Sequence, residues 1–240
     1  MVSLIKKKNS KLIARQVISL EIEALKLLKR SLNRNFDKAV NAIVNCQSKI
    51  IFCGVGKSGL IASKIASTMS SVGCPAFSLS ANDCLHGDLG SISTKDLLIL
   101  ISNSGKSKEL LPIIKFANRN KIKLIGIVSE KNSSLYKGSD IQILLPEVKE
   151  AGLGIVPTSS TSVQLAVGDA LAVSALNKKK FSKYDFSKLH PGGNLGKQLK
   201  TVEELMVTKN KIPFINENKN LKNAIKTITS KKLGVLVAKN

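Results

Sequence analysis

The sequence has few aromatic residues, and this scarcity limits how it could bind nucleic acid. Tryptophan is absent and tyrosine occurs twice, although the formal net charge at pH 7 is +22. Of the 38 basic side chains, 34 are lysine and four are arginine, dispersed along the chain. Proteins that read nucleic acids usually cluster positive charge, use arginine for paired hydrogen bonds and stack bases on aromatic rings. We therefore expect no nucleic-acid partner and interpret the charge as a solvated surface that helps attract anionic ligands.

Long apolar runs and paired cysteines are also missing. No apolar stretch approaches the roughly 20 residues of a membrane-spanning helix. The basic segment 1–8 is followed by an amphipathic segment instead of the apolar core of a signal peptide. Cys46, Cys53, Cys74 and Cys84 form no C-x-x-C pair, which is typical of reduced thiols. We expect a cytoplasmic protein with no membrane partner.

Apolar runs of strand length alternate with helical patterns along the chain. A length of 240 residues suits one α/β domain with an appendage. The alternation predicts a doubly wound, parallel, five-stranded sheet with helices on both faces. Its ligand should bind beyond the carboxyl ends of the strands. Strands are predicted at 49–53, 75–79, 96–101, 122–128 and 140–145, and helices at 10–34, 36–46, 58–71, 107–118 and from about 158 to 176.

Two turns rich in serine and glycine follow the first and third predicted strands. Gly-Val-Gly-Lys-Ser-Gly occupies 54–59, and Ser-Asn-Ser-Gly-Lys-Ser occupies 102–107. Glycine lets the backbone approach a ligand, serine hydroxyls donate hydrogen bonds, and each following helix offers unpaired N–H groups. Two such turns at one sheet edge predict a phosphorylated ligand.

The first turn departs from two nucleotide-binding motifs. A Walker loop would need glycine at position 51, where this sequence has isoleucine. The dinucleotide fingerprint Gly-x-Gly-x-x-Gly does occur, but no acidic residue lies near position 79 to bind a ribose. If only one of these turns were present, it could be a tight connection that binds no ligand. The presence of the second turn favours a phosphorylated ligand.

Ionisable side chains follow several of these strands. His86 and His190 are the only histidines, and both lie in glycine-containing loops. Glu109 begins the helix after the second turn, Glu150 follows the fifth predicted strand, and Lys57 lies in the first turn. Each of these residues also has a simpler explanation. The histidines could be packed or surface residues, and Glu109 could place favourable charge at a helix N-terminus. Glu150 and Lys57 could simply be solvated. Together, these ionisable side chains suit acid–base chemistry on a sugar phosphate.

The ordered motifs of this chain resemble the arabinose-5-phosphate isomerases, which are sugar isomerase (SIS) domain enzymes. The resemblance covers about 12–200 and rests on GVGKSG, LHGDLG, ISNSGKSKEL, VPTSST, GDALA and HPGGNLG, in this order. It implies a SIS domain over 1–200 that interconverts D-ribulose 5-phosphate and D-arabinose 5-phosphate, on the route to the Kdo sugar of lipopolysaccharide. It also implies a sugar-phosphate partner, no cofactor and a homotetramer.

The resemblance assigns functional positions as well. It implies catalytic roles for Lys57, Glu109, Glu150 and His190. We hypothesise that Glu150 moves the proton, with Glu109 as the second choice, and that His190 assists ring opening. Substrate contacts are expected at Gly56, Ser58, Gly73, Cys74, His86, Ser102, Asn103, Ser104, Ser107, Thr158, Ser159 and Ser160.

Three departures from the family pattern stand out. Ser80 replaces a histidine linked to an inhibitory zinc ion, although Cys84 with His86 could act as ligands instead; no metal is required. Ala-Gly-Leu-Gly at 151–154 stands where a cysteine is usual. Residues 201–240 resemble the start of the first of two CBS domains, so we expect a partial CBS domain that is weakly ordered or swapped onto a neighbouring subunit. It should expose Leu233, Val235 and Val237 and contribute no nucleotide site.

Two alternative functions stay open at this point. Another SIS isomerase could act on a different sugar phosphate, for instance a seven-carbon ketose phosphate. A ligand-sensing SIS module would bind a sugar phosphate without turnover. Such regulators usually carry an N-terminal DNA-binding helical domain, and residues 1–48 have no convincing helix-turn-helix pattern.

Overall fold

The computed structural model describes residues 9–190 and 202–239. The chain divides into two compact units, the first ending at Leu189 and the second beginning at His190. The domain boundary predicted at 200/201 lies at the edge of 191–201, outside the described residues. Among the helices that the structure describes, none is both long and apolar enough to cross a membrane.

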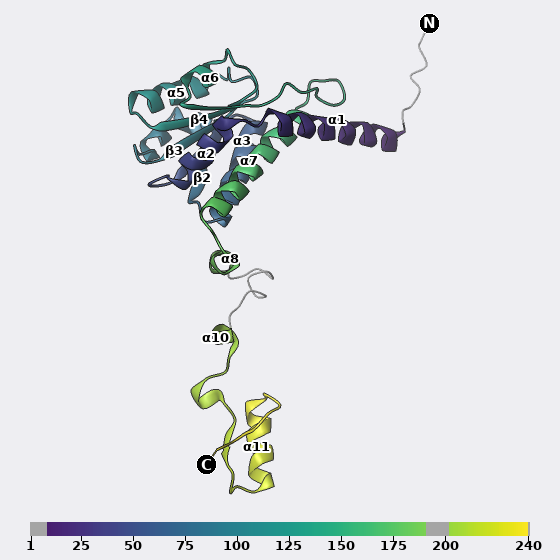
Figure 1. The fold of residues 1–240 in the computed structure, drawn as a ribbon, viewed down its shortest axis with the longest axis vertical. Coiled ribbons are helices and arrows are strands. Elements are labelled where there is room, and N and C mark those ends of the chain that lie inside the picture. The colour runs from purple at the N-terminus through teal and green to yellow at the C-terminus, as the bar shows by residue number, and fades with distance from the viewer. Residues whose placement is uncertain (1–8, 191–201, 240) are drawn as a thin grey trace. The chain divides into compact units, whose positions relative to one another are not determined.

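The first unit is built on a five-stranded parallel sheet, as predicted (Figure 1). Its spatial order is β2-β1-β3-β4-β5. Every strand begins one residue later than the sequence pattern indicated. The strands are β1 (Ile50–Gly54), β2 (Ala76–Ser80), β3 (Leu97–Ile101), β4 (Lys123–Val128) and β5 (Ile141–Leu144).

The central strands β1 and β3 are continuous apolar runs because both faces of the sheet are buried there, whereas the edge strand β2 is only partly buried. In β1, Ile50 and Phe52 belong to one apolar core, and Ile51 and Cys53 belong to the other. β3 divides its side chains between the two cores in the same way. This alternation follows from the two-residue repeat of a strand.

Helices cover both faces of the sheet, which confirms the doubly wound arrangement. The first core contains side chains of α1 (Ser10–Ser31), α2 (Arg34–Val44), α3 (Lys57–Ser71) and α7 (Ser159–Lys178). The second contains side chains of α4 (Ala81–Cys84), α5 (Leu110–Arg119) and α6 (Ser134–Gly138). The sequence pattern missed α4 and α6 because each is too short to display a helical repeat. A 3₁₀ turn, η1 (Asp88–Ser91), follows α4, and α8 (Lys183–Leu189) ends the unit.

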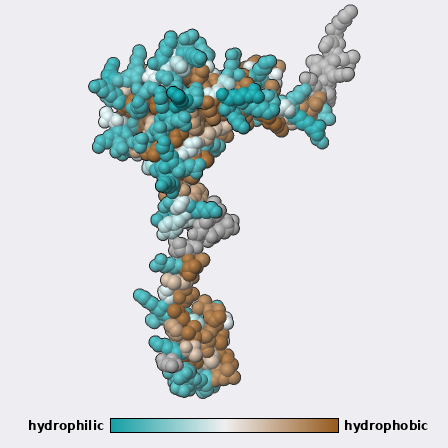
Figure 2. Space-filling model, viewed as in Figure 1, coloured by the Kyte–Doolittle hydropathy of each residue, from teal (hydrophilic) through white to brown (hydrophobic). Residues whose placement is uncertain are grey.

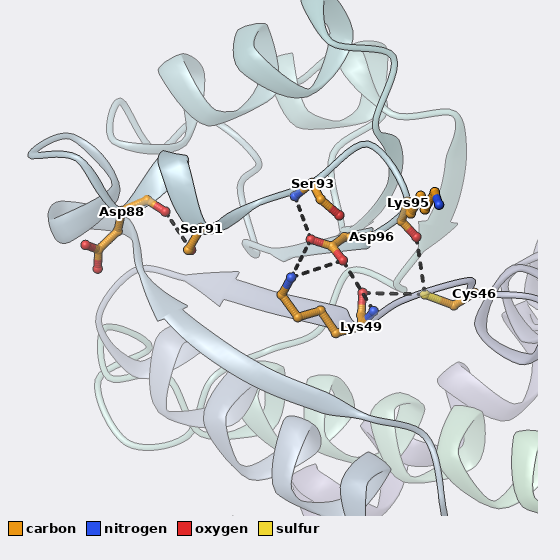
Figure 3. Close-up of polar contacts among 7 residues, drawn as sticks. All are labelled: Cys46, Lys49, Asp88, Ser91, Ser93, Lys95 and Asp96. Atoms are coloured by element: carbon orange, nitrogen blue, oxygen red, sulfur yellow. Dashed lines mark hydrogen bonds and ion pairs between the residues drawn. The ribbon is translucent and has the colours of Figure 1, made fainter.

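At the amino edge of the sheet, the buried carboxylate of Asp96 connects two segments by hydrogen bonds (Figure 3). Asp96 Oδ2 accepts hydrogen bonds from Ser93 N at 2.7 Å and Lys49 Nζ at 3.0 Å, and Oδ1 accepts one from Lys49 N at 3.3 Å. Burial by itself would raise the pKa of Asp96, but hydrogen bonds from Ser93, Ser48 and Lys49 outweigh it and lower the pKa to about 2. This carboxylate therefore ties the loop before β3 to the start of β1.

The second unit is small and exposes apolar side chains. It contains α10 (Val202–Leu205), a 3₁₀ turn η2 (Lys209–Lys211), β6 (Phe214–Asn216), α11 (Leu221–Lys231) and β7 (Val237–Lys239). β6 and β7 pair in parallel, and β6 was not predicted. Figure 2 shows hydrophobic residues gathered on this unit, and the predicted exposure of Leu233, Val235 and Val237 is confirmed.

Candidate active site

The two serine- and glycine-rich turns lie at the point where the strand order reverses. From β1 the chain passes to β2 on one side and then returns to β3 on the other side of β1. A reversal of this kind opens a crevice at the carboxyl ends of the strands, where ligands of open α/β sheets bind. Turn 54–59 follows β1 and turn 102–107 follows β3, so the expectation that they share one edge is confirmed.

In the first turn, two of the three glycines serve packing between strand and helix. A Cβ atom on Gly54 would lie 2.8 Å from the Ser58 backbone, and one on Gly59 would lie 2.8 Å from the Gly54 carbonyl. Gly56 has φ +59° and precedes α3 without a side chain that could cap it. We expected the glycines to let a ligand approach the backbone. Instead, Gly54 and Gly59 allow the end of β1 and the start of α3 to pack closely against each other. Gly56 leaves the first N–H groups of α3 without a capping side chain.

In the second turn, the serine hydroxyls hold the turn itself. Ser102 is buried, and its Oγ accepts a hydrogen bond from Gly105 N at 3.0 Å and lies 3.2 Å from Ser107 Oγ. Ser104 Oγ accepts a hydrogen bond from Lys106 N at 3.3 Å. These hydroxyls therefore have a structural role that the sequence pattern did not reveal, because the pattern cannot give the direction of a side chain.

A cavity of about 360 Å³ lies between the first turn, Asn103 and the start of α7. Its volume is in the range of small-molecule sites. Of the predicted site residues it brings together five, contributed by separate segments. The full lining is Val55, Lys57, Ser58, Asn103, Glu150, Ile155, Pro157, Ser160, Thr161 and Gln164.

Glu150 is held against the N-terminus of α7. Its Oε2 atom accepts hydrogen bonds from Thr158 N at 2.7 Å, Thr158 Oγ1 at 3.0 Å and Ser160 N at 3.3 Å. Burial alone would raise the pKa of Glu150, but hydrogen bonds from Ser160 and Thr158 outweigh burial, so the pKa lies below its ordinary value. Glu150 is thus an ionised carboxylate fixed at a helix N-terminus and facing the cavity, not a solvated loop acid.

Two buried polar atoms near this carboxylate lack partners. Within the described residues, Ser159 Oγ and Gln164 Oε1 have no hydrogen-bond partner. Ser159 is fully buried, and Gln164 is 1% exposed and lines the cavity. Leaving such an atom unpaired costs about 1–3 kcal/mol. Sequence reasoning missed Gln164; the available signal was a polar residue on the buried face of an otherwise apolar helix.

The other predicted residues lie outside the cavity lining. Gly73 and Cys74 precede β2, at the amino edge of the sheet, and the Cys74 side chain is buried in the first core. His86 is exposed on the loop after α4. Glu109 is half-buried and is the N-cap residue directly before α5. His190 is half-buried at the start of the second unit, so its role in the site stays a prediction.

The structure does not support the suggested zinc ligands. Cys84 is buried in the second core, and its thiol is hydrogen-bonded to that of Cys53, whereas His86 is exposed. Within the described residues, no three histidine, cysteine or acidic side chains gather closely enough to hold a metal ion. Because α4 turns Cys84 into the apolar core, the described contacts give no support to its pairing with His86.

The chain is similar to known proteins in both sequence and fold. A model of the SIS domain matches residues 43–174. The chain is 41% identical over 225 residues to the arabinose 5-phosphate isomerase KdsD of Yersinia pestis, which covers 93% of this chain and 69% of that protein. It is 37% identical to protein RP505 of Rickettsia prowazekii, over 94% of this chain and 71% of that protein. The solved structure of c3406 from E. coli CFT073 in complex with arabinose 5-phosphate is similar, with a TM-score of 0.73 and 36% identity over 76% of this chain and 99% of that one.

Proposed function

Because this chain belongs to the SIS domain family, and within it to the arabinose 5-phosphate isomerases, we propose that it interconverts D-ribulose 5-phosphate and D-arabinose 5-phosphate. The protein is an isomerase. The observation that carries the proposed substrate is the cavity in which Lys57, Glu150 and the start of α7 meet. We further propose that the reaction supplies the Kdo branch of lipopolysaccharide synthesis in the cytoplasm.

The phosphate group has a clear place in this proposal. α3 begins at Lys57, which lines the cavity, and α7 begins at Ser159, one residue before Ser160 in the cavity lining. The N-terminus of α3 has no side-chain cap, so it offers unpaired N–H groups and a positive dipole end to an anion, whereas Ser160 N of α7 already donates to Glu150. The ammonium group of Lys57 adds a full positive charge beside them. Ser58 and Ser160 supply hydroxyls from the same two helix starts.

Proton transfer is assigned to Glu150. The isomerisation removes a proton from carbon 1 of the ketose, forms an enediol, and returns a proton to carbon 2, while the hydroxyl proton moves between the two oxygens. No electron acceptor is needed, because one carbon is oxidised as its neighbour is reduced. Glu150 is ionised and lines the cavity, as a base must be. Glu109 is the second candidate, and His190 is proposed to assist ring opening.

A homotetramer is proposed for the assembly. In Figure 1 the first half of α1 extends beyond the sheet, and the exposed side chains of this half include Leu12, Ile13 and Ile18. The loop before α7 exposes Leu153, Ile155 and Val156. Apolar surface of this extent favours contact with other copies of the chain. We propose, from the resemblance of its sequence, that the second unit is part of a CBS domain.

Turnover of the purified protein tests the proposed function. Ribulose 5-phosphate should be converted to arabinose 5-phosphate without added nicotinamide or ATP, and deuterium from solvent should enter at carbon 1 or 2. A panel of other sugar phosphates should react more slowly. Binding without turnover, under reducing conditions with a chelator, would instead favour a ligand-sensing module.

A further inference from the structure

Gln164 is a buried polar residue that the proposed chemistry has not used. It lies on α7, is 1% exposed and lines the cavity beside Ser160 and Thr161. Ser160 and Gln164 are four residues apart, so they occupy the same face of the helix one turn apart. Gln164 therefore lies one helical turn further along α7 than Ser160, whose hydroxyl is proposed to face the phosphate.

The amide of Gln164 requires a partner that the described protein does not provide. Its Oε1 atom is buried and has no hydrogen-bond partner within residues 9–190 and 202–239. The neighbouring residues Val163 and Val167 belong to the first core, so on the core side α7 places apolar side chains beside Gln164. Buried polar atoms are nearly always paired, and an exception in a cavity wall indicates a bound group.

We propose that Gln164 binds a hydroxyl group of the sugar and so determines which sugar phosphate the site accepts; this proposal rests on the proposed function. A hydroxyl both donates and accepts hydrogen bonds, so it satisfies the amide whichever way the amide is turned. A phosphate group only accepts at neutral pH, and the N-terminus of α3 with Lys57 already suits it. The cavity thus has an anion-binding part at the start of α3 and a neutral polar part at Gln164.

The test compares Gln164→Leu and Gln164→Met with the unchanged protein. Both substitutions remove the amide, leucine keeping a similar volume and methionine a similar shape. We expect kcat/KM for ribulose 5-phosphate to fall about 10-fold or more, since a buried hydrogen bond to the substrate is lost. Competitive inhibition by inorganic phosphate should stay within about twofold, because the anion-binding part is intact. Gln142→Leu is the matched control; Gln142 lies on β5 and its Nε2 donates to Ser139 O at 2.5 Å, outside the cavity lining.

Each outcome decides the proposal. Retention of kcat/KM within about twofold in both variants would overturn it. Equal weakening of phosphate inhibition would also overturn it, because Gln164 would then support the cavity wall as a whole. If one variant fails to fold, the other decides. If the proposed function is wrong, the unchanged protein will show no turnover. The role of Gln164 is then decided by calorimetry, which compares the binding of ribulose 5-phosphate to the unchanged protein and to Gln164→Leu. Equal binding to both proteins, or no binding to either, would reject the proposed role of Gln164.

Discussion

Thr158 and Glu150 are joined by two hydrogen bonds that end on the same carboxylate oxygen. Thr158 N lies 2.7 Å and Thr158 Oγ1 lies 3.0 Å from Glu150 Oε2. Thr158 Oγ1 also accepts a hydrogen bond from Ala151 N at 2.9 Å. The loop between the fifth strand and α7 is therefore closed on itself, and this closure fixes the proposed base at the cavity.

Replacement of Glu150 by glutamine separates its two roles. Glutamine keeps an oxygen that Thr158 can bond but removes the base, so kcat should fall at least about 100-fold. KM should change little, because the binding groups remain. Glu147→Gln, at an exposed position on the same loop, is the control and should leave kcat unchanged. An undiminished rate in Glu150→Gln would transfer the role to Glu109.

The pH dependence of the reaction reports on the same carboxylate. Because the pKa of Glu150 is lowered from 4.5, the group stays ionised down to a pH below that value. The acidic limb of kcat/KM that belongs to Glu150 should therefore lie below pH 4.5, provided the protein remains folded. A limb well above that pH that disappears in Glu150→Gln would contradict the environment described for this residue.

Ser104→Ala tests whether the second turn anchors the phosphate. A hydroxyl bonded to an anion contributes about 1.5–3 kcal/mol, so KM for the phosphorylated sugar should rise by about 10-fold or more. The rate at saturation should change less. The comparison is made with the unphosphorylated sugar, whose binding should be unaffected. Equal weakening for both sugars would show that Ser104 supports the turn and not the phosphate.

Asp96→Asn tests the amino edge of the sheet. A pKa lowered from 3.8 to about 2 corresponds to about 2 kcal/mol of stability. Because the folded pKa lies below the unfolded one, this stability is present above about pH 4 and is lost as the pH falls toward about 2. Denaturant unfolding should thus show a deficit of about 2 kcal/mol for the variant at pH 7 that shrinks at pH 3. Asp185→Asn, at a half-buried position outside both apolar cores, should show a smaller deficit at pH 7. An equal deficit at both pH values for Asp96→Asn would refute the assignment.

Removal of the residues after Thr201 should leave most of the isomerase activity. The first unit has its own cores, and Lys57, Glu109, Glu150 and His190 all precede the cut. The measurement is kcat/KM of the shortened chain, with the oligomeric state followed by light scattering. Control of the full chain by AMP or ATP, together with resistance of residues 202–239 to proteases, would show a working regulatory module instead.

The sequence by itself determined the sheet and the edge that carries the site. Strands buried on both faces must be continuous apolar runs, so the patterns at 49–53 and 96–101 located β1 and β3 to within one residue. In a parallel sheet the turns that follow such strands lie at one edge, and this placed both serine- and glycine-rich turns together. Elements of four or five residues, such as α4 and α6, were missed because they are shorter than the pattern that identifies a helix.

Only the tertiary structure decided where individual side chains point. The directions of Cys84, toward the apolar core, and of Gln164, toward the cavity, depend on how a helix is rotated against its neighbours. The hydrogen bonds from Thr158 to Glu150 join residues eight positions apart and form only when the intervening loop folds back. Local patterns fix which residues are helical or extended, whereas packing between distant segments fixes rotation and loop closure, and the chemistry of this site depends on both.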